Sequence, residues 1–116
     1  MIPSGVEIYV ALEPVDMRLS FDRLSGLAQE QIGYDARCGA LFIFFGRRRD
    51  ALKILFFDGS GMAIFYKRLD RGVYQIPEAP SATARHVEID DATLEAILDG
   101  IDVDDAASPR APLKTH

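Results

Sequence analysis

The spacing of hydrophobic and polar residues predicts a first strand followed by a helix. Residues 6–12 alternate between the two classes, so that Val6, Ile8 and Val10 share one face of a strand. From about residue 19 the apolar residues follow the helical period instead. Gly33 is suited to end this helix, because glycine readily adopts the left-handed conformation of a C-terminal cap. The apolar stripe of the helix comprises Leu24, Leu27, Ala28 and Ile32.

Three strand-like runs with short connections follow at residues 40–45, 51–57 and 62–69. The first run is almost entirely apolar, which is typical of a central strand. The connection at residues 58–61 (Asp-Gly-Ser-Gly) predicts a hairpin turn, because glycine tolerates the positive φ that such turns require. The three runs therefore predict an antiparallel meander. Shorter runs predict further strands at residues 73–76 and 85–89.

A second helix is predicted by its capping residues. Asp90 suits the N-cap position, and Ile89 and Leu94 occupy the two positions of a hydrophobic staple. Gly100 lies where the helix would close. The buried stripe comprises Leu94, Ile97, Leu98 and Ile101.

These elements predict an α+β fold, with a mainly antiparallel sheet of about five strands built on a β-meander core and two helices packed on it. We expect both helices to cover the same face of the sheet. Residues 102–116 mix Asp, Ala, Ser and Pro without periodicity. We therefore expect a single domain over residues 1–101 and a disordered C-terminal tail over residues 102–116.

Length and composition fit this single domain. The chain has 116 residues, of which 48% are hydrophobic, as is ordinary for a globular domain with its own core. Its one cysteine, Cys38, excludes an internal disulfide and a cysteine-rich zinc site. No apolar run approaches the roughly 20 residues of a membrane span, and the first residues lack the pattern of a signal peptide. We expect a cytoplasmic protein with no membrane association, no metal and no cofactor.

The net charge of −5 conceals an uneven distribution of charge. Residues 47–77 contain seven basic and three acidic side chains, for a net charge of +4. Residues 78–105 contain one basic and nine acidic side chains, for a net charge of −8. A basic block next to an acidic one is a clue to charged partners that the total does not give.

The meander gathers the basic residues at one end of the sheet. A two-residue loop at residues 59–60 pairs Leu52 with Lys67 and Ala51 with Arg68. The arginine-rich turn before residue 51 therefore meets the segment at residues 67–71. The candidate DNA-binding residues are Arg47, Arg48, Arg49, Lys53, Lys67, Arg68 and Arg71.

Guanidinium groups match phosphate oxygens, so we interpret this cluster as a contact site for a nucleic-acid backbone. Tyr66 and Tyr74 lie nearby in the sequence and could stack on bases. Two other interpretations stay open. The arginines could simply keep a turn polar, or they could pair with the acidic segment of the same chain at residues 88–105.

A second charged group surrounds the start of the first helix. Asp16, Arg18 and Asp22 are candidate partner-binding residues, although a helix cap with a local ion pair would explain them as well. Asp16, Asp22 and Asp58 could also form a metal-binding set for nuclease chemistry. Capping, a solvated helix face and turn formation account for these three carboxylates more simply. We therefore predict no catalytic residue and no enzymatic activity.

The order and spacing of several short motifs over residues 1–101 resemble those of one protein family. No single motif is specific, but together they cover nearly the whole domain. They are Met1-Ile2-Pro3 with Gly5-Val6, Asp16-Met17-Arg18 with Phe21-Asp22 and Leu24, Gly39-x-Leu41-Phe42-Ile43-Phe44, Gly46-Arg47-Arg48-Arg49-Asp50, Lys53-Ile54-Leu55, Asp58-Gly59-x-Gly61, Lys67-Arg68-Leu69, Gly72, Pro77 and Leu98-x-Gly100-Ile101-Asp102. In these motifs the chain resembles the TnpB accessory protein, the second reading frame product, of bacterial insertion-sequence family sixty-six.

The resemblance implies a protein encoded in a mobile element and needed, with companion proteins, for efficient transposition. It implies that a separate transposase carries the strand-transfer chemistry and that the element's other small accessory protein binds DNA through a helix-turn-helix. Two functions remain to be distinguished. The first is an accessory protein that contacts DNA at the element ends within a transposase complex. The alternative is an adaptor that binds the transposase or the other accessory protein without touching DNA.

Overall fold

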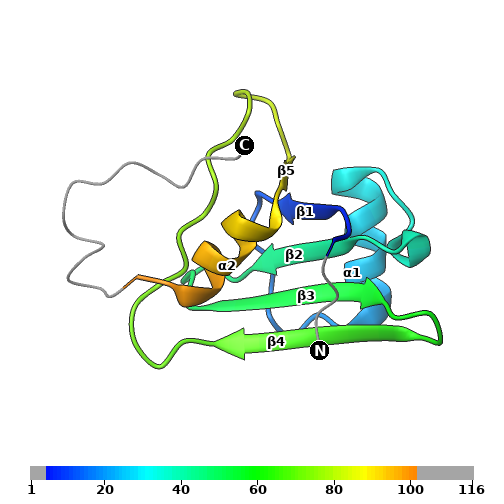
Figure 1. The fold of residues 1–116 in the computed structure, drawn as a ribbon, viewed down its shortest axis with the longest axis horizontal. Coiled ribbons are helices and arrows are strands. Elements are labelled where there is room, and N and C mark those ends of the chain that lie inside the picture. Colours follow the sequence, from blue (N-terminus) through cyan, green and yellow to red (C-terminus); the bar gives the residue numbers. More distant parts are fainter. Residues whose placement is uncertain (1–4, 102–116) are drawn as a thin grey trace.

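The computed structural model describes residues 5–101, which form a five-stranded sheet between two helical layers (Figure 1). The strands lie in the order β4-β3-β2-β1-β5. The strands and α-helices are β1 (Ile8–Ala11), α1 (Phe21–Leu27), β2 (Leu41–Phe45), β3 (Ala51–Phe57), β4 (Met62–Arg68), β5 (His86–Ile89) and α2 (Asp91–Asp99). The tail expected over residues 102–116 lies outside the described residues.

The predicted meander is present, and its register is the one that a two-residue loop requires. β2, β3 and β4 pair antiparallel, with Leu52 opposite Lys67 and Ala51 opposite Arg68. The backbone N–H of Asp58 donates to the carbonyl of Gly61 over 3.0 Å, which closes the hairpin. The turn chemistry of residues 58–61 therefore sets the register of the two longest strands.

The first two strands are parallel, which distinguishes the sheet from a pure meander. Ile8 pairs with Leu41 and Val10 with Ile43, and the arrows of β1 and β2 point the same way in Figure 1. The connection between them includes α1, as a crossover between parallel strands usually does. β5 then pairs antiparallel with β1 and forms the second edge. The sheet is mainly antiparallel, as predicted, with this one parallel pair.

The first helix ends differently from a regular α-helix. After Leu27 it widens into a π-helix, η1 (Ala28–Ile32), which Gly33 ends in the left-handed conformation at φ 93°. Ser20 occupies the N-cap position of α1, but its side chain makes no capping hydrogen bond. A short 3-10 helix, η2 (Ala36–Cys38), then leads into β2.

The second helix forms as its sequence predicts. The carboxylate of Asp90 accepts from the N–H of Thr93 over 2.8 Å, which is an N-cap hydrogen bond. Ile89 and Leu94, the staple residues, are both buried in the same core cluster. Gly100 occupies the C-cap position with φ 68°.

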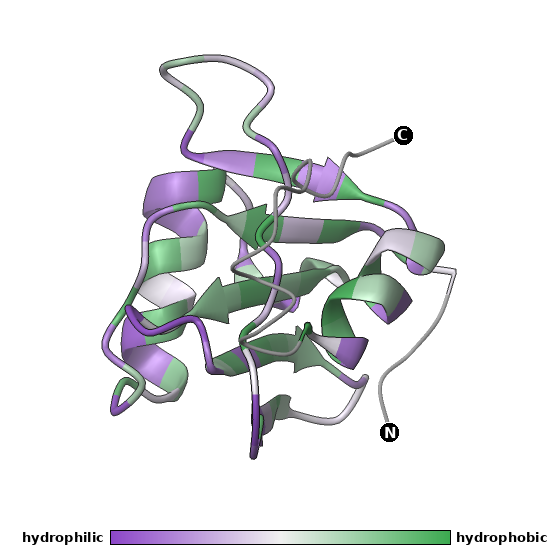
Figure 2. Ribbon diagram, turned by 90° about the vertical axis from the view of Figure 1, so that its left-hand side faces the viewer, coloured by the Kyte–Doolittle hydropathy of each residue, from purple (hydrophilic) through white to green (hydrophobic). Residues whose placement is uncertain are grey.

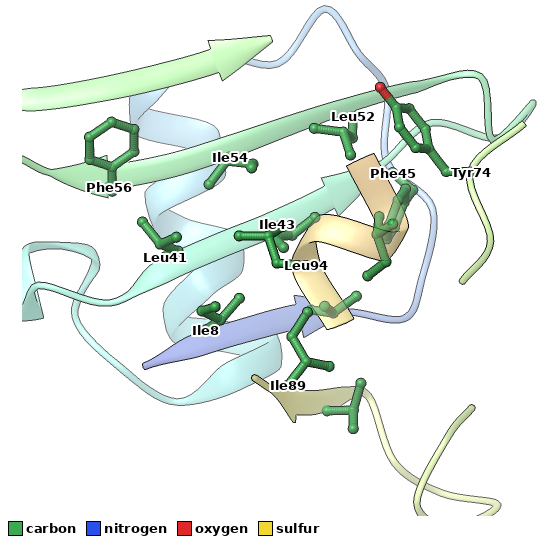
Figure 3. Close-up of a cluster of buried hydrophobic side chains, with 13 residues drawn as sticks. Ile8, Leu41, Ile43, Phe45, Leu52, Ile54, Phe56, Tyr74, Ile89 and Leu94 are labelled. Carbon is green, nitrogen blue, oxygen red and sulfur yellow. The ribbon is translucent and has the colours of Figure 1, made fainter. Parts of the chain in front are cut away.

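The two helices cover opposite faces of the sheet, so the expectation that they share one face is wrong. Figure 2 shows α1 and α2 on the two sides of the strands. Leu94 and Ile97 of α2 pack with Ile43 on one face (Figure 3), whereas Leu24 of α1 packs with Phe42 on the other. The cause is β2, in which all five residues are buried. A strand that is apolar on both faces needs a cover on each.

The run at residues 73–76 is not a strand. Val73 forms a single bridge with Ile101, just beyond α2. Tyr74 turns inward and is fully buried, with its ring centroid 5.9 Å from that of Phe45 (Figure 3). This segment therefore closes the core beside α2 and leaves β4 as an edge of the sheet.

Candidate nucleic-acid interface

The parallel pairing of β1 and β2 brings two loops to the same edge of the sheet. The segment after β1 contains Asp16, and the turn after β2 contains Arg47. The N–H of Val15 donates to the carbonyl of Phe45 over 2.8 Å, which fixes the first loop beside the end of β2. The contact is close, since a Cβ on Gly46 would lie 2.9 Å from Cγ of Met17. Glycine at this position allows the two loops to touch.

The arginine turn projects three guanidinium groups into solvent. Its ends are held by the N–H of Gly46, which donates to the carbonyl of Ala51 over 3.0 Å. Arg47, Arg48 and Arg49 are all exposed. Arg49 has φ 61° and is the only residue other than glycine with positive φ in the described part of the chain. Its carbonyl accepts from the N–H of Tyr74 over 2.6 Å, so this unusual backbone is anchored.

Arg68 joins the arginine turn from the neighbouring strand. It lies opposite Ala51, and the N–H of Leu69 donates to the carbonyl of Asp50 over 2.8 Å. The guanidinium of Arg68 donates to the phenolic oxygen of Tyr66 over 3.1 Å, and this hydrogen bond raises the pKa of Arg68. The predicted convergence of the arginine turn with the end of β4 is therefore present. We call the exposed set Arg47, Arg48, Arg49 and Arg68 the arginine surface.

A pocket of ≈ 410 Å³ lies within this surface. Arg47, Arg48 and Arg68 line it together with Asp16 and Asp50. The pocket lining therefore combines hydrogen-bond donors for anions with two acidic side chains. A smaller pocket of ≈ 120 Å³ lies beside it and shares Arg47 and Gly46 with it.

Asp16 and Arg18 form a local ion pair on the rim of this pocket. Two hydrogen bonds from Nε and one from Nη2 of Arg18 reach the carboxylate, the shortest at 2.7 Å. These hydrogen bonds lower the pKa of Asp16 to about 2, and the positive charge of Arg47 acts in the same direction. Asp22 lies apart, exposed in the first turn of α1 next to the exposed ring of Phe21. Of the three candidate partner-binding residues, Asp16 and Arg18 thus border the arginine surface as an ion pair. Asp22 lies on α1 instead.

Lys53 does not belong to the exposed surface, contrary to the sequence-based grouping. It is only 9% exposed, because α1 and the chain before it cover this face of β3. Its ammonium group donates to the carbonyl of Leu19 over 2.7 Å and lies 4.9 Å from the ring centroid of Tyr66. Lys53 therefore connects β3 to the chain before α1.

Lys67 and Arg71 lie at the same end of the sheet but differ from the arginine surface. The ammonium group of Lys67 donates to the carbonyl of Leu98 over 3.1 Å, in the last turn of α2. A cation there is favourable, because the last carbonyls of a helix carry partial negative charge. Lys67 is half-buried, whereas Arg71 is exposed in the segment after β4.

The two tyrosines considered for base stacking have different environments. Tyr74 has no exposed surface, and burial raises the pKa of its phenol to about 12, so the stacking expectation for Tyr74 is wrong. Its hydroxyl instead donates to the carbonyl of Lys67. Tyr66, in contrast, is 48% exposed on the edge strand.

The acidic segment of the chain does not neutralise the arginine turn within residues 5–101. Ion pairs in this part of the chain include those of Arg18 with Asp16 and of Arg85 with Glu13 and Glu30. None of them involves the arginine turn. Residues 102–105 of the acidic segment lie outside the described residues.

The three carboxylates considered for nuclease chemistry do not form a common site. Asp58 lies in the β3–β4 hairpin, at the far end of β3 from the arginine turn, and its carboxylate accepts from the N–H groups of Ser60 and Gly61. Across residues 5–101, no three His, Cys, Asp or Glu side chains are arranged to hold a metal ion. The same stretch contains no helix with the length and apolar character needed to cross a membrane.

The proximity of Asp16 and Met17 to the arginine turn was missed by sequence reasoning. The predicted order of strand, helix and strand over residues 6–45 contains the signal for it. That order is typical of a βαβ unit, in which the two strands are parallel and their carboxyl ends lie at the same sheet edge. Parallel pairing of the two strands predicts that the loops that follow them lie side by side.

The family described as IS66 Orf2-like protein matches residues 6–108 of the chain. An uncharacterized protein of Sinorhizobium fredii, y4hO, is 38% identical over 104 residues, which cover 88% of this chain and 88% of that protein. A second uncharacterized protein of the same organism, y4jC, is 37% identical over 73 residues, or 63% of this chain and 62% of that protein. No solved structure matches the chain at a significant level.

Proposed function

The chain belongs to the IS66 Orf2-like family, and from this premise we propose that it is a non-enzymatic accessory protein of insertion-sequence transposition that contacts DNA through the arginine surface. The observation that carries this proposal is the convergence of four exposed guanidinium groups, three from the arginine turn and one from β4. Guanidinium groups bind phosphate oxygens through two parallel hydrogen bonds. The partners proposed with it are the DNA of the element ends, the transposase and the other accessory protein.

The geometry of the turn supports a binding role over a merely polar turn. A polar connection needs neither three consecutive arginines nor a strained backbone at the third of them. In the described residues, Arg47, Arg48 and Arg49 form no ion pair that would compete with a ligand. The negative total charge of −5 restricts the attraction to this local surface, so we expect binding of modest strength.

Fluorescence anisotropy with a fluorescein-labelled duplex of the element end tests this proposal. The wild-type protein is expected to bind at low salt, with an affinity that falls as salt rises, because each neutralised phosphate releases counterions. The double variant Arg47→Gln/Arg48→Gln should weaken binding. It should also make the slope of log K against log salt shallower by about 0.9 for each phosphate that the variant no longer neutralises.

A matched control removes the same charge elsewhere. Arg23 and Arg37 are exposed outside the arginine surface, so Arg23→Gln/Arg37→Gln should leave the affinity and the slope nearly unchanged. Equal effects of the two double variants would indicate unspecific attraction and contradict a defined surface. Absence of binding by the wild-type protein at low salt would overturn the DNA contact.

The adaptor function is the second candidate, and the observation that favours it is the acidic margin of the same edge. Asp16 and Asp50 line the pocket beside the arginines, and Asp22 is exposed next to Phe21. A protein partner with both charges would match this edge, and an apolar residue of the same partner would match Phe21 at the start of α1. A pull-down of the element's transposase, with and without terminal DNA, separates the candidates. Capture that does not depend on DNA and survives Arg47→Gln/Arg48→Gln favours the adaptor.

A further inference from the structure

We propose that the arginine surface takes an unpaired nucleotide, whose base stacks on Tyr66 while the adjoining phosphates lie against Arg68 and the arginine turn. The inference rests on the proposed DNA contact and specifies its ligand as single-stranded nucleic acid. Its structural basis is the side chain of Tyr66, which contacts with Lys53 and Arg68 hold in place at the edge of the sheet.

Two contacts fix the ring of Tyr66. The buried ammonium group of Lys53 lies 4.9 Å from the ring centroid, so the ring face toward the protein is occupied by a cation–π contact. The phenolic oxygen accepts a hydrogen bond from Arg68. Tyr66 as a residue is 48% exposed, and no other ring stacks on its ring among the residues described. An aromatic ring that is already immobilised loses little entropy when a ligand stacks on it.

Tyr66 differs in this respect from the other three tyrosines of the chain. Tyr9 and Tyr74 are buried. Tyr34 is exposed, but its ring stacks on Tyr9 with the centroids 4.9 Å apart. Tyr66 is thus the exposed tyrosine whose ring stacks on no other ring among the described residues, and it lies next to the arginine surface.

Arg68 connects the ring to the ≈ 410 Å³ pocket of the arginine surface. Residues 66 and 68 point to the same face of β4, about 6.6 Å apart along the strand. Arg68 contacts the Tyr66 hydroxyl and also lines the ≈ 410 Å³ pocket with Arg47 and Arg48. A base on the ring would therefore have its adjoining phosphates within reach of three guanidinium groups. This pairing of an aromatic platform with a basic groove is the general device for binding single strands.

Base pairing decides which nucleic acid can use such a platform. Inside a duplex, away from its two ends, each base is covered by its neighbours in the stack, so an aromatic ring cannot reach its face. In a single strand, a bulge or a loop the face is available. The ring of Tyr66 would then add affinity only for unpaired bases, whereas the arginines would attract both forms.

The test measures anisotropy of one labelled sequence as a single strand and as a blunt duplex at the same salt. We expect the wild-type protein to bind the single strand more tightly. Stacking is worth about 1–3 kcal/mol per base, so Tyr66→Ala should weaken single-strand binding by about 5- to 150-fold and duplex binding by less than about twofold. Tyr66→Phe keeps the ring and should retain most of the affinity. Tyr34→Ala, at an exposed tyrosine outside the arginine surface, is the matched control and should have little effect on either.

A spectroscopic readout on the wild-type protein makes the test independent of whether Tyr66→Ala folds. An oligonucleotide with 2-aminopurine at successive positions should change its emission at one position on binding, because stacking on a ring alters that fluorophore. Equal affinities for the two forms, or no emission change at any position, would overturn the inference. If Arg47→Gln/Arg48→Gln still weakened duplex binding in that case, the proposed DNA contact would stand without it. If the wild-type protein bound neither the single strand nor the duplex, both this inference and the proposed DNA contact would be wrong.

Discussion

Arg49 shows at the residue scale how the arginine turn is built. Its φ of 61° is uncommon for a residue with a side chain, and the hydrogen bond from Tyr74 to its carbonyl holds it there. Such strain costs of order 1–3 kcal/mol and persists only where the surroundings determine the conformation. Arg49 therefore places a charged side chain at a backbone position that suits glycine.

Substitutions of Arg49 are expected to change stability according to how readily the new residue adopts a positive φ. Arg49→Gly should leave the free energy of unfolding unchanged or raise it by up to about 1 kcal/mol, because the relief of strain exceeds the entropy that glycine adds to the unfolded chain. Arg49→Val should lower it by about 1–2 kcal/mol, since a β-branched side chain resists positive φ. Urea unfolding measures both. If Arg49→Gly were less stable than Arg49→Val, the backbone assignment would be wrong.

The pair formed by Asp16 and Arg18 predicts a specific pH dependence. The pKa of Asp16 is about 2 in the folded protein and about 3.9 in an unfolded chain. A depressed pKa means that this carboxylate stabilises the fold above about pH 4 and that its contribution is lost as the pH falls toward 2. An NMR titration of the carboxyl carbon should give a midpoint near 2 in the wild-type protein and a higher one in Arg18→Gln. A midpoint near 4 in both proteins would show that the pair does not form in solution.

At the scale of elements, two lysines tie the strands to other parts of the chain. Lys53 on β3 bonds to the carbonyl of Leu19 before α1, and Lys67 on β4 bonds to the carbonyl of Leu98 in α2. The two lysines point to opposite faces of the sheet. Lys67 lies opposite Leu52, which belongs to the core cluster under α2. Lys53 shares its face of β3 with Leu55, which belongs to the core cluster under α1. On each face of the sheet, one lysine thus connects a strand near the arginine surface to the helical layer that covers that face.

Lys53 is expected to contribute mainly to the stability of the fold. Lys53→Ala should lower the free energy of unfolding by about 1–3 kcal/mol, because the carbonyl of Leu19 loses its partner. Arg48→Ala, at an exposed position, should change it by less than about 0.5 kcal/mol. Thermal unfolding followed by circular dichroism compares the two. A Lys53→Ala protein as stable as Arg48→Ala would contradict the structural role.

At the scale of the whole molecule, the sheet separates two hydrophobic cores. Ile97 belongs to the core under α2, and Ile32 belongs to the core under η1 and α1. The intervening strand β2 contributes alternate side chains to each, Phe42 and Phe44 to one and Ile43 to the other. The cores share a backbone layer but form separate clusters of side chains.

This separation predicts additive effects of small deletions. Ile32→Val and Ile97→Val should each lower the free energy of unfolding by about 0.5–1.5 kcal/mol. The double variant should show the sum within about 0.5 kcal/mol, because distant sites without shared partners act independently. Denaturant unfolding of the single and double variants provides the numbers. A coupling above about 1 kcal/mol would mean that the two faces communicate through the sheet.

Much of the fold could be predicted because local features decide it. The turn at residues 58–61 determines the β3–β4 register, and Asp90 with its staple determines where α2 begins. The faces of the helices were harder to assign. Periodicity identifies which side of a helix is apolar, but it does not say which face of the sheet that side meets.

The sequence by itself determined the strands of the meander, the two helices and the concentration of charge around the arginine turn. Only the tertiary structure decided which of the seven candidate basic residues face solvent. Lys53 is covered by the chain before α1, and Tyr74, unlike Tyr66, is turned into the core. The physical reason is that periodicity and turn chemistry act over a few residues. Exposure depends on elements distant in the sequence, which cover one side chain and leave its neighbour open.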